Sequence, residues 1–299
     1  MRTFFRRSQF AILLVLLLAP VAQAQMASKA RKALMWKVTS PTTTLYLVGS
    51  IHLADTSVYP LPQPVEDAFS ASPVLVVEVD MTKVDEATSK SMMQDKAMYG
   101  AGATLSQHIT KPTSDALDVY CNEQGVPRAT FEQMKPWMAA ILVSILPMMK
   151  TGSDPNLGID KHFMDAVKPP QRIEQLETLD FQLDVLGSGT EAEQDQFLAD
   201  SLKQSPRIIE FRDRMEAAFF EGDAEALLKL MDETKTGSEA LNKRMIDDRN
   251  VAMEAKLEKY LKGKEQVFVV VGAAHLVGPK GIAQLLNDHG FKVERMLAK

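Results

Sequence analysis

The sequence predicts an α/β fold in which a mixed central sheet is built from the amino- and carboxy-terminal parts of the chain, with a large helical insertion between them. Two apolar runs near the start, "LYLVGS" and "VLVVEVD", and one near the end, "VFVVVG", show almost no polar alternation. Such runs are typical of strands covered on both faces, as in parallel or mixed sheets. From about residue 85 to about residue 262, apolar residues instead recur at helical spacing.

The first 24 residues have the pattern of a cleaved secretory signal. Arginines precede an apolar stretch from Phe10 to Ala19, and the small residues that end at Ala24 suit signal-peptidase cleavage before Gln25. The apolar stretch is about half of the ~20 residues needed to span a bilayer, so we expect no stable membrane span after cleavage. Residues 25–299 are then one domain, which we expect in the periplasm or outside the cell.

The amino-terminal part predicts a hairpin, a helix and a strand. "ALMWKVTS", the turn "PTTT" and "LYLVGS" predict the hairpin within residues 33–50. "PLPQPVEDAFSAS" predicts a short helix begun after prolines, and "PVLVVEVD" predicts the strand that follows it. The carboxy-terminal part repeats this logic, since "EQVFVVVGAAH" predicts a strand, "GPKGIAQLLNDHG" a helix closed by Gly290, and "FKVERML" a last strand.

The middle of the chain predicts helices. "DAEALLKLMDE" and "GSEALNKRMIDDRNVAMEAKLEKYLKGK" are amphipathic. The methionine-rich run "WMAAILVSILPMMK", from Trp137 to Lys150, is too short for a membrane span and contains Pro147, so it predicts a buried helix. The alternative for this run is an apolar groove that binds a peptide or a lipid, since methionine side chains adapt to varied partners.

Charge and cysteine content exclude some classes of function. The chain has 34 basic and 39 acidic residues; removal of the three signal arginines leaves 31 basic residues and a formal net charge of −8. A surface of this sign is poorly suited to phosphate backbones, so we expect no nucleic-acid partner. Cys121 is the single cysteine, so it forms no intrachain disulfide, and we interpret it as a small buried apolar residue.

Two Gly-x-x-His units, Gly49 to His52 and Gly272 to His275, each follow a predicted strand. Glycine there allows a tight turn or a close approach of the backbone. Because ligands of α/β sheets collect outside the carboxyl ends of the strands, parallel neighbouring strands would bring the two histidines to one edge. A single histidine in such a motif more often has a structural role than a catalytic one. The occurrence of two Gly-x-x-His units after two predicted strands is what favours a function.

Glu78 adds a third group near a strand end. An unpaired carboxylate in an apolar strand is costly, so we expect Glu78 to be paired, hydrogen-bonded or bound to a metal. Two imidazoles and one carboxylate are typical of a catalytic metal site with an open position for water. Glu78 is either a ligand or the general base of this site.

Other polar residues have simpler interpretations. Asp160, near His162, is expected to cap a helix or complement its dipole. We expect the remaining histidines, His108 and His289, to be solvated. Arg249 and Asn250 in "DDRN" are interpreted from the helical pattern as exposed polar positions.

The combined motifs resemble the TraB/GumN family, which is related to the Tiki metalloproteases and to bacterial pheromone-shutdown proteins. The similarity covers nearly all of residues 25–299. Ala54 departs from the glycine that relatives often have after His-Leu, a difference that concerns the loop. The matching segments are "LYLVGSIHLAD", the downstream "LP", "VVEVD", "MKPW", "NLGIDKHFMDAV", "IEQLET", "RN" and "VFVVVGAAHLVGPKGIAQLLNDHGFKVERM".

The resemblance implies a fold akin to the erythromycin-esterase and ChaN-like group and a hydrolytic centre that depends on a divalent cation such as Mn²⁺, Co²⁺ or Zn²⁺. By matching position, it implies that the site contains Gly49, His52, Glu78, Gly272 and His275, and that Arg249 and Asn250 belong to a family signature. Some relatives are described as proteases and others as inhibitors that sequester a peptide signal, so fold and family leave the activity open.

Three hypotheses therefore follow from the sequence. The first is a periplasmic metal-dependent hydrolase, most simply a peptidase, in which His52, His275 and Glu78 hold the cation. The second is a non-enzymatic protein that captures a peptide or small-molecule ligand between the sheet edge and the helical insertion. The third gives the two histidines a purely structural role as hydrogen-bonding groups at the sheet end.

Overall fold

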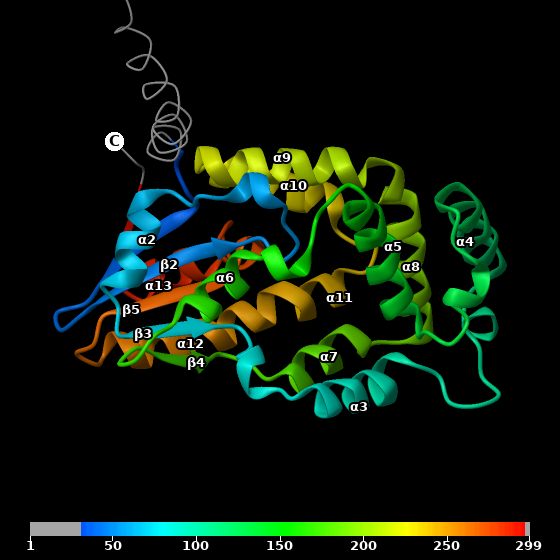
Figure 1. Cartoon of the computed structure of the whole chain (residues 1–299), viewed down its shortest axis with the longest axis horizontal. Helices are drawn as coiled ribbons and strands as arrows, with labels where there is room; N and C mark the ends of the chain where they lie inside the picture. Colours follow the sequence, from blue (N-terminus) through cyan, green and yellow to red (C-terminus); the bar gives the residue numbers. More distant parts are fainter. Residues whose placement is uncertain (1–30, 297–299) are drawn as a thin grey trace, which may run out of the picture.

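The computed structural model describes residues 31–296, and the predicted signal peptide lies outside this range. A six-stranded sheet forms one half of this part, and a group of helices forms the other (Figure 1). The strand order is β4-β3-β5-β2-β1-β6. The strands are β1 (Met35–Thr39), β2 (Thr44–Ser50), β3 (Val74–Val77), β4 (Arg172–Gln175), β5 (Val267–Gly272) and β6 (Lys292–Arg295).

The sheet is mixed, as the sequence predicts. β1 and β2 form the expected antiparallel hairpin, and β6 extends it as an antiparallel edge strand. β5 lies between β2 and β3 and is parallel to both, and β4 is parallel to β3. The carboxyl ends of β2, β3, β4 and β5 therefore lie on one edge of the sheet, which faces the helical half (Figure 1).

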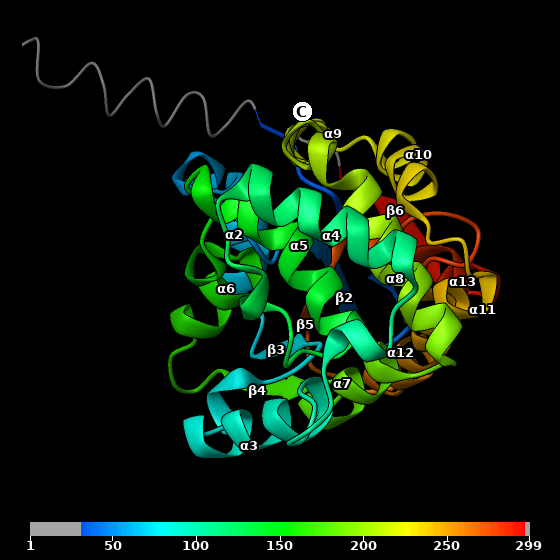
Figure 2. The same ribbon diagram turned by 90° about the vertical axis from the view of Figure 1, so that its right-hand side faces the viewer.

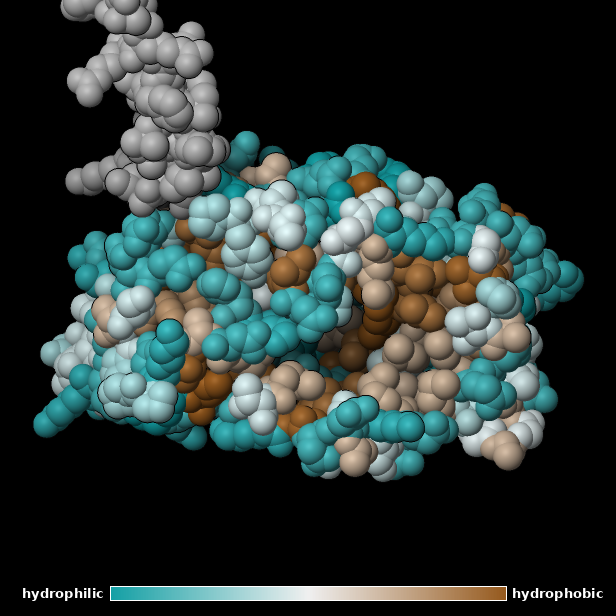
Figure 3. Space-filling view, viewed as in Figure 1, coloured by the Kyte–Doolittle hydropathy of each residue, from teal (hydrophilic) through white to brown (hydrophobic). Residues whose placement is uncertain are grey.

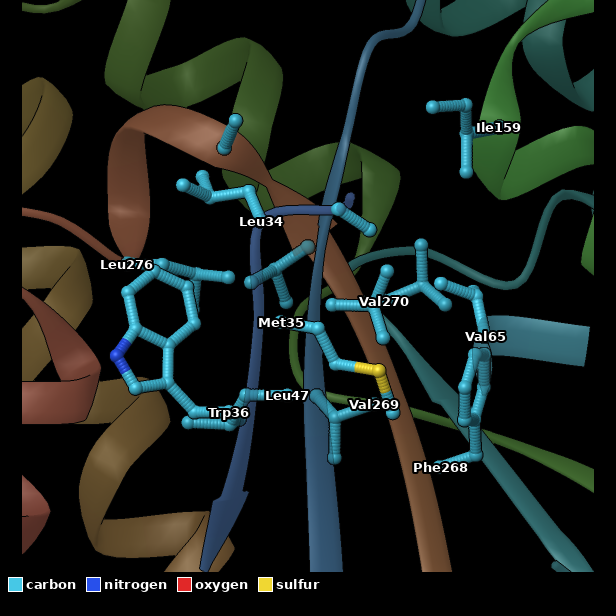
Figure 4. Packing of buried hydrophobic residues seen from close by; sticks show 14 of the residues in the cluster. Leu34, Met35, Trp36, Leu47, Val65, Ile159, Phe268, Val269, Val270 and Leu276 are labelled. Carbon is cyan, nitrogen blue, oxygen red and sulfur yellow. The ribbon is translucent and has the colours of Figure 1, made fainter. Parts of the chain in front are cut away.

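The core surrounds β5, whose six residues are all buried. Figure 4 shows Val269 and Val270 in the middle of the apolar cluster, with Phe268 and Val65 to one side. The Phe268 ring lies 4.9 Å from the ring of Phe163 and 5.5 Å from that of Phe69. These contacts fix helices α2 (Gln63–Ser70) and α6 (Ile159–Ala166) against the central strand. Helices α12 (Asp248–Leu261) and α13 (Ile282–Asp288) also bury residues in this core.

The helical half has a second core between α4, α5 and α8, which Figure 2 shows facing the viewer. A one-turn π-helix (Lys243–Asp247) joins α11 to α12. The remaining helices are α3 (Glu86–Ala97), α4 (Lys111–Gln124), α5 (Pro136–Lys150), α7 (Leu179–Gly187), α8 (Glu191–Gln204), α9 (Ile208–Glu221), α10 (Ala224–Thr234) and α11 (Glu239–Asn242).

The segment from about residue 85 to about residue 262 is not purely helical, because it contains β4. The sequence of this strand, "RIEQ", has no apolar run, and its side chains are exposed or half-buried. An edge strand of this kind gives no signal of periodicity, because only one side of it is paired.

The methionine-rich run forms helix α5, which buries Trp137, Ala140 and Val143 and contains Pro147. The prediction of a buried helix is therefore confirmed. Across residues 31–296, no helix combines the length and the apolar character that crossing a bilayer requires.

Candidate metal centre

The strand ends bring three groups together at the sheet edge. Ser50, the last residue of β2, pairs with Gly272, the last residue of β5, so the turns that follow both strands lie side by side. His52 and His275 stand in these two turns. Glu78 comes directly after β3 instead of within it, which corrects the sequence interpretation and gives the carboxylate access to both turns.

The two imidazoles face the same carboxylate oxygen. His52 Nε2 lies 3.9 Å from Glu78 Oε1, and His275 Nε2 lies 4.0 Å from the same atom. His275 and Glu78 are buried, with 4% and 9% of their surface exposed, whereas the His52 side chain keeps 59% of its surface exposed. The group is therefore reached from solvent on the His52 side.

The other ring nitrogen of each histidine is held by an oxygen acceptor. His52 Nδ1 donates to Asp160 Oδ1 at 3.0 Å, and Ser50 Oγ donates to the same oxygen at 2.7 Å. His275 Nδ1 donates to Asn250 Oδ1 at 2.7 Å. Asn250 Nδ2 donates to the carbonyl of Lys280, which fixes the orientation of the amide. Both histidines thus turn Nε2 toward Glu78, the arrangement in which outer-sphere acceptors orient metal-binding imidazoles.

Gly272 leaves open space between these donors. A Cβ atom at this position would lie 3.1 Å from His52 Nε2 and 3.2 Å from Glu78 Oε1. The three donor atoms do not all lie within 4.8 Å of one another, and ligands of one Zn²⁺ ion at about 2.0–2.2 Å are roughly 3–3.5 Å apart. The donor types, their orientation and the open space fit a divalent cation once the exposed His52 ring moves inward.

Glu78 is held in its ionised form. The amide of Gly272 donates to Oε1 at 2.6 Å, and Arg249 Nη2 and Gln182 Nε2 donate to Oε2 at 2.7 and 2.9 Å. Burial opposes ionisation, but the imidazoles, the Arg249 guanidinium and the Gly272 amide together lower the pKa of Glu78 to about 2. A carboxylate with this pKa is a weak base, which favours the ligand role over that of general base.

Glu177 is a second buried carboxylate at the same edge, which the sequence analysis did not select. The backbone amide of Glu177 donates to the carbonyl of Glu78 at 2.7 Å. The segments that follow the parallel strands β3 and β4 therefore still lie side by side. Arg249 Nη2 contacts one oxygen of Glu177 at 2.7 Å, and Arg249 Nε lies 3.0 Å from the other. One guanidinium is therefore shared between two carboxylates. The sequence could have pointed to Glu177 only through its position, which is two residues after the end of β4, the strand that pairs with β3.

The two histidines have opposite pKa shifts. Burial lowers the pKa of His275 to about 4, because the attraction of Glu78 does not offset it and Arg249 opposes the charge. At His52 the neighbouring protein atoms remove water from the ring and act to lower the pKa, although much of the side chain is exposed, but the hydrogen bond and charge of Asp160 and the charge of Glu78 raise it to about 9. In the absence of a cation, His275 is neutral and His52 is protonated at pH 7.

The structure corrects two interpretations of polar residues and leaves two residues outside the group. Arg249 and Asn250 are not exposed, since Asn250 has 1% of its surface exposed and the Arg249 side chain 14%. Asp160 does not cap α6, but it lies in the first turn of this helix, where it complements the dipole as predicted, and it also orients His52. His162 contacts Glu66 at 3.1 Å and takes no part in the group. A Cβ at Gly49 would lie 3.1 Å from both Ala273 Cβ and a Leu34 methyl group, so this glycine serves close packing.

Comparison with known proteins identifies the family of this chain. The TraB/PrgY/gumN family matches the chain over residues 34–295. The chain belongs to this family. It is similar to the "Uncharacterized protein YbaP" of Escherichia coli (strain K12), with 24% identity over 247 residues that cover 81% of this chain and 87% of that protein. The protein of the same name from Shigella flexneri matches equally.

No solved structure matches this TraB/PrgY/gumN chain significantly. The mixed α/β fold that the sequence predicts is confirmed by the strand order, whereas the likeness to the erythromycin-esterase and ChaN-like group stays a prediction.

A cavity of about 950 Å³ adjoins the candidate centre of this TraB/PrgY/gumN protein. It reaches Asn250, which holds His275, so its inner end lies behind that histidine. Figure 3 shows a hollow with apolar walls where the sheet half meets α5, α7 and α8. Phe197 of α8 lines the cavity and also packs with the apolar residues of α5 and α7. Other apolar residues that line the cavity are Met231, Met245, Ile246, Ala274 and Val277, and its charged lining residues are Asp232, Lys235, Glu239, Lys243, Asp247 and Lys280.

Replacement of Gly272 by alanine is expected to prevent cation binding at the centre formed by His52, His275 and Glu78, with little effect on stability. The added methyl group would occupy the space between His52 Nε2 and Glu78 Oε1, and the backbone at this residue has φ −48°, which alanine adopts without strain. Isothermal titration with Mn²⁺, Co²⁺ and Zn²⁺ measures the first effect and urea denaturation the second. Gly100→Ala is the matched control, because a Cβ there meets nothing within 4 Å. Unchanged cation affinity of Gly272→Ala would contradict the placement of the site.

In the metal-free protein, the combined contribution of His52, His275 and Glu78 to stability is expected to be largest near pH 6.5. Below 6.5 the unfolded chain binds a proton at His275 that the folded protein, with a pKa of about 4, does not; Glu78 acts in the same direction between 4.5 and about 2. Above 6.5 the folded protein retains the His52 proton up to about pH 9, so this stabilisation is lost as the pH rises through 9.

Urea denaturation in EDTA between pH 3 and pH 10 measures this profile. The alkaline decline is expected to weaken in His52→Ala, and the decline between pH 6.5 and pH 4 is expected to weaken in His275→Ala. A profile that both substitutions leave unchanged would show that these groups are not coupled to folding.

Proposed function

We propose that this protein is a metal-dependent hydrolase whose substrates are peptides. The observation that carries the proposal is the shared orientation of His52 and His275: each imidazole is fixed through Nδ1 and directs Nε2 to Glu78 Oε1, beside the space that Gly272 leaves open. Family membership supports the proposal, because the paired Gly-x-x-His pattern is the feature by which the sequence resembles metalloproteases.

His52, His275 and Glu78 would hold the cation, for which Mn²⁺, Co²⁺ and Zn²⁺ are the candidates by donor type. When bound, a divalent cation polarises a carbonyl group and makes water a stronger nucleophile at neutral pH. Asp160 and Asn250 keep the two imidazoles in the tautomer that presents Nε2. Arg249 offsets the charge of Glu78 and Glu177, so two buried carboxylates are tolerated beside the imidazoles.

The surroundings of the centre suit a peptide with apolar side chains. The hollow in Figure 3 has apolar walls, whereas the cavity beside Asn250 is lined by apolar residues and by charged or polar residues in similar number. Half-buried methionine, isoleucine and leucine side chains of α3, α5 and α7 pack around the buried residues Ala97, Trp137 and Leu183. Methionine side chains adapt to partners of different shape, so we expect selection for apolar character rather than for one particular side chain.

The same cavity supports a second candidate function, the capture of a peptide without cleavage. Its size is in the usual range of ligand pockets, and its inner wall reaches the residue that holds His275. Peptide binding that persists in His52→Ala/His275→Ala, with no cleavage in either protein, would favour capture over hydrolysis.

We also propose that the protein acts after export, since residues 1–24 have the pattern of a signal peptide. Fractionation of cells that express the full chain, with amino-terminal sequencing of the exported form, tests this. An exported form that begins at Gln25 is the expected result.

The decisive experiment for hydrolysis uses residues 25–299 purified without an affinity tag that binds metals. The protein is stripped with EDTA, reloaded with Mn²⁺, Co²⁺ or Zn²⁺, and incubated with a defined peptide library whose products are identified by mass spectrometry. We expect cleavage that EDTA abolishes and one of the cations restores. Absence of cleavage with every cation would overturn the proposal of a peptidase.

A further inference from the structure

A second group of ionisable side chains lies where helix α12 meets the end of α13. Glu254 and Glu258 are one helical turn apart on α12, so they project from the same face. His289 directly follows α13, and its Nδ1 atom lies 2.9 Å from Glu254 Oε1 and 2.9 Å from Glu258 Oε1. Among residues 31–296, these three side chains place their potential ligand atoms within 4.8 Å of one another.

The two carboxylates approach each other in a partly buried place. The Glu254 side chain has 3% of its surface exposed and that of Glu258 has 23%, while His289 is reached from solvent. Burial raises the pKa of Glu254, and the neighbouring Glu258 carboxylate raises it further. Lys262 Nζ contacts Glu258 Oε2 at 2.8 Å, whereas His289 contacts the other oxygen, Oε1. One imidazole is thus the shared partner of two acidic groups.

We propose that Glu254, Glu258 and His289 form a second divalent-cation site, which is independent of His52, His275 and Glu78 and is best suited to Zn²⁺. One imidazole nitrogen and two carboxylate oxygens are ligands that Zn²⁺ accepts at about 2.0–2.2 Å, and three protein ligands leave a position for water. Two ligands at such distances from one cation are roughly 3–3.5 Å apart, slightly more than the observed 2.9 Å between His289 Nδ1 and each carboxylate, so a small outward movement of the side chains admits the cation. A cation there neutralises the repulsion between the carboxylates.

The site would fasten the helix that supports the first centre. Arg249 and Asn250 lie in the first turn of α12 and contact Glu78 and His275, and Glu254 follows one turn later. His289 belongs to the connection between α13 and β6, where Gly290 turns the chain with φ +88°. A cation bound by all three side chains therefore links α12 to this connection, and we expect a structural role in place of a catalytic one.

The test uses the tag-free His52→Ala/His275→Ala protein, in which two donors of the first centre are absent. Zn²⁺ titration by calorimetry and metal analysis after gel filtration are expected to find one Zn²⁺ per chain. Addition of His289→Ala is expected to weaken this binding by more than about tenfold, since loss of a ligand exceeds the effect of losing an outer-sphere partner. Zn²⁺ is also expected to raise the melting temperature of the protein that retains His289, and not of the one that lacks it.

His108→Ala in the same background is the matched control, because His108 is a solvent-accessible histidine with a single carboxylate partner, Glu191 at 2.9 Å. This control is expected to bind Zn²⁺ as its parent does. Equal Zn²⁺ binding with and without His289, or no Zn²⁺ bound by the parent, would overturn the proposal. Either result leaves the first centre untouched, because that centre is tested by cleavage and by binding that depends on His52 and His275.

Discussion

The protein that carries His52→Ala and His275→Ala is expected to lose cation binding at the first centre and to cleave peptides far more slowly than the wild type. Loss of an outer-sphere partner costs roughly 10- to 100-fold in affinity or activity, so removal of two direct donors is expected to exceed about 100-fold in kcat/KM. The fold is expected to persist, since His52 is largely exposed and the core around β5 does not depend on either imidazole. Titration with Mn²⁺, Co²⁺ and Zn²⁺ and rates of peptide cleavage measure the effect.

Two further variants are compared with the double substitution, one as a control and one as a test of an outer-sphere partner. His108→Ala removes a histidine of the helical half and is expected to leave both affinity and cleavage unchanged. Asn250→Ala removes the acceptor of His275 Nδ1 and is expected to cost about 10- to 100-fold while the donor atoms remain. Cleavage that survives the double substitution at wild-type rates would exclude the assigned centre.

Replacement of Arg249 by methionine is expected to lower the free energy of unfolding by about 3–5 kcal/mol. The guanidinium contacts Glu78 and Glu177 at 2.7 Å each, and both carboxylates are nearly buried. Its removal leaves two nearly buried carboxylates beside each other without the cation that both of them contact. Urea denaturation at pH 7 in EDTA measures the change, and EDTA keeps a bound cation from replacing the lost charge.

Arg214→Met is the matched control, because Arg214 also contacts two carboxylates, Glu210 and Glu233, but on the exposed surface. Exposed pairs contribute about 0–1 kcal/mol, so this variant is expected to stay near the wild type. Addition of Glu177→Gln to Arg249→Met is expected to recover part of the lost stability, because it removes one of the two carboxylate charges that no longer contact Arg249. Equal losses in Arg249→Met and Arg214→Met would show that the charge cluster does not stabilise the fold.

Much of the sheet could be predicted from the sequence, because its strands are local and strongly apolar. β2, β3 and β5 are fully or largely buried, and a strand that is buried on both faces consists of an unbroken run of apolar residues. The hairpin of β1 and β2 followed from the turn between two such runs. β4 did not follow, because its four residues are polar and it pairs only at its β3 side among the described strands.

The partners of the candidate centre could be predicted only in part. His52, Glu78 and His275 were found because each follows a strand, and strand ends collect ligands. Asp160 contacts His52 across 108 residues of sequence, and Arg249 contacts Glu78 across 171. Each of these residues also has a sufficient local explanation, as a helix start or a helical surface position. Local patterns therefore could not reveal their contacts with the strand ends.

The sequence by itself determined the apolar strands, the repeated glycine and histidine at their ends, and the family to which these motifs belong. Only the tertiary structure decided that β5 lies between β2 and β3, and with it that both imidazoles face one carboxylate oxygen. It also decided that one guanidinium pairs with both Glu78 and Glu177. The physical reason is that strand propensity and helical periodicity are properties of neighbouring residues. Electrostatic compensation and ligand geometry depend instead on distances between segments that only the packed chain brings together.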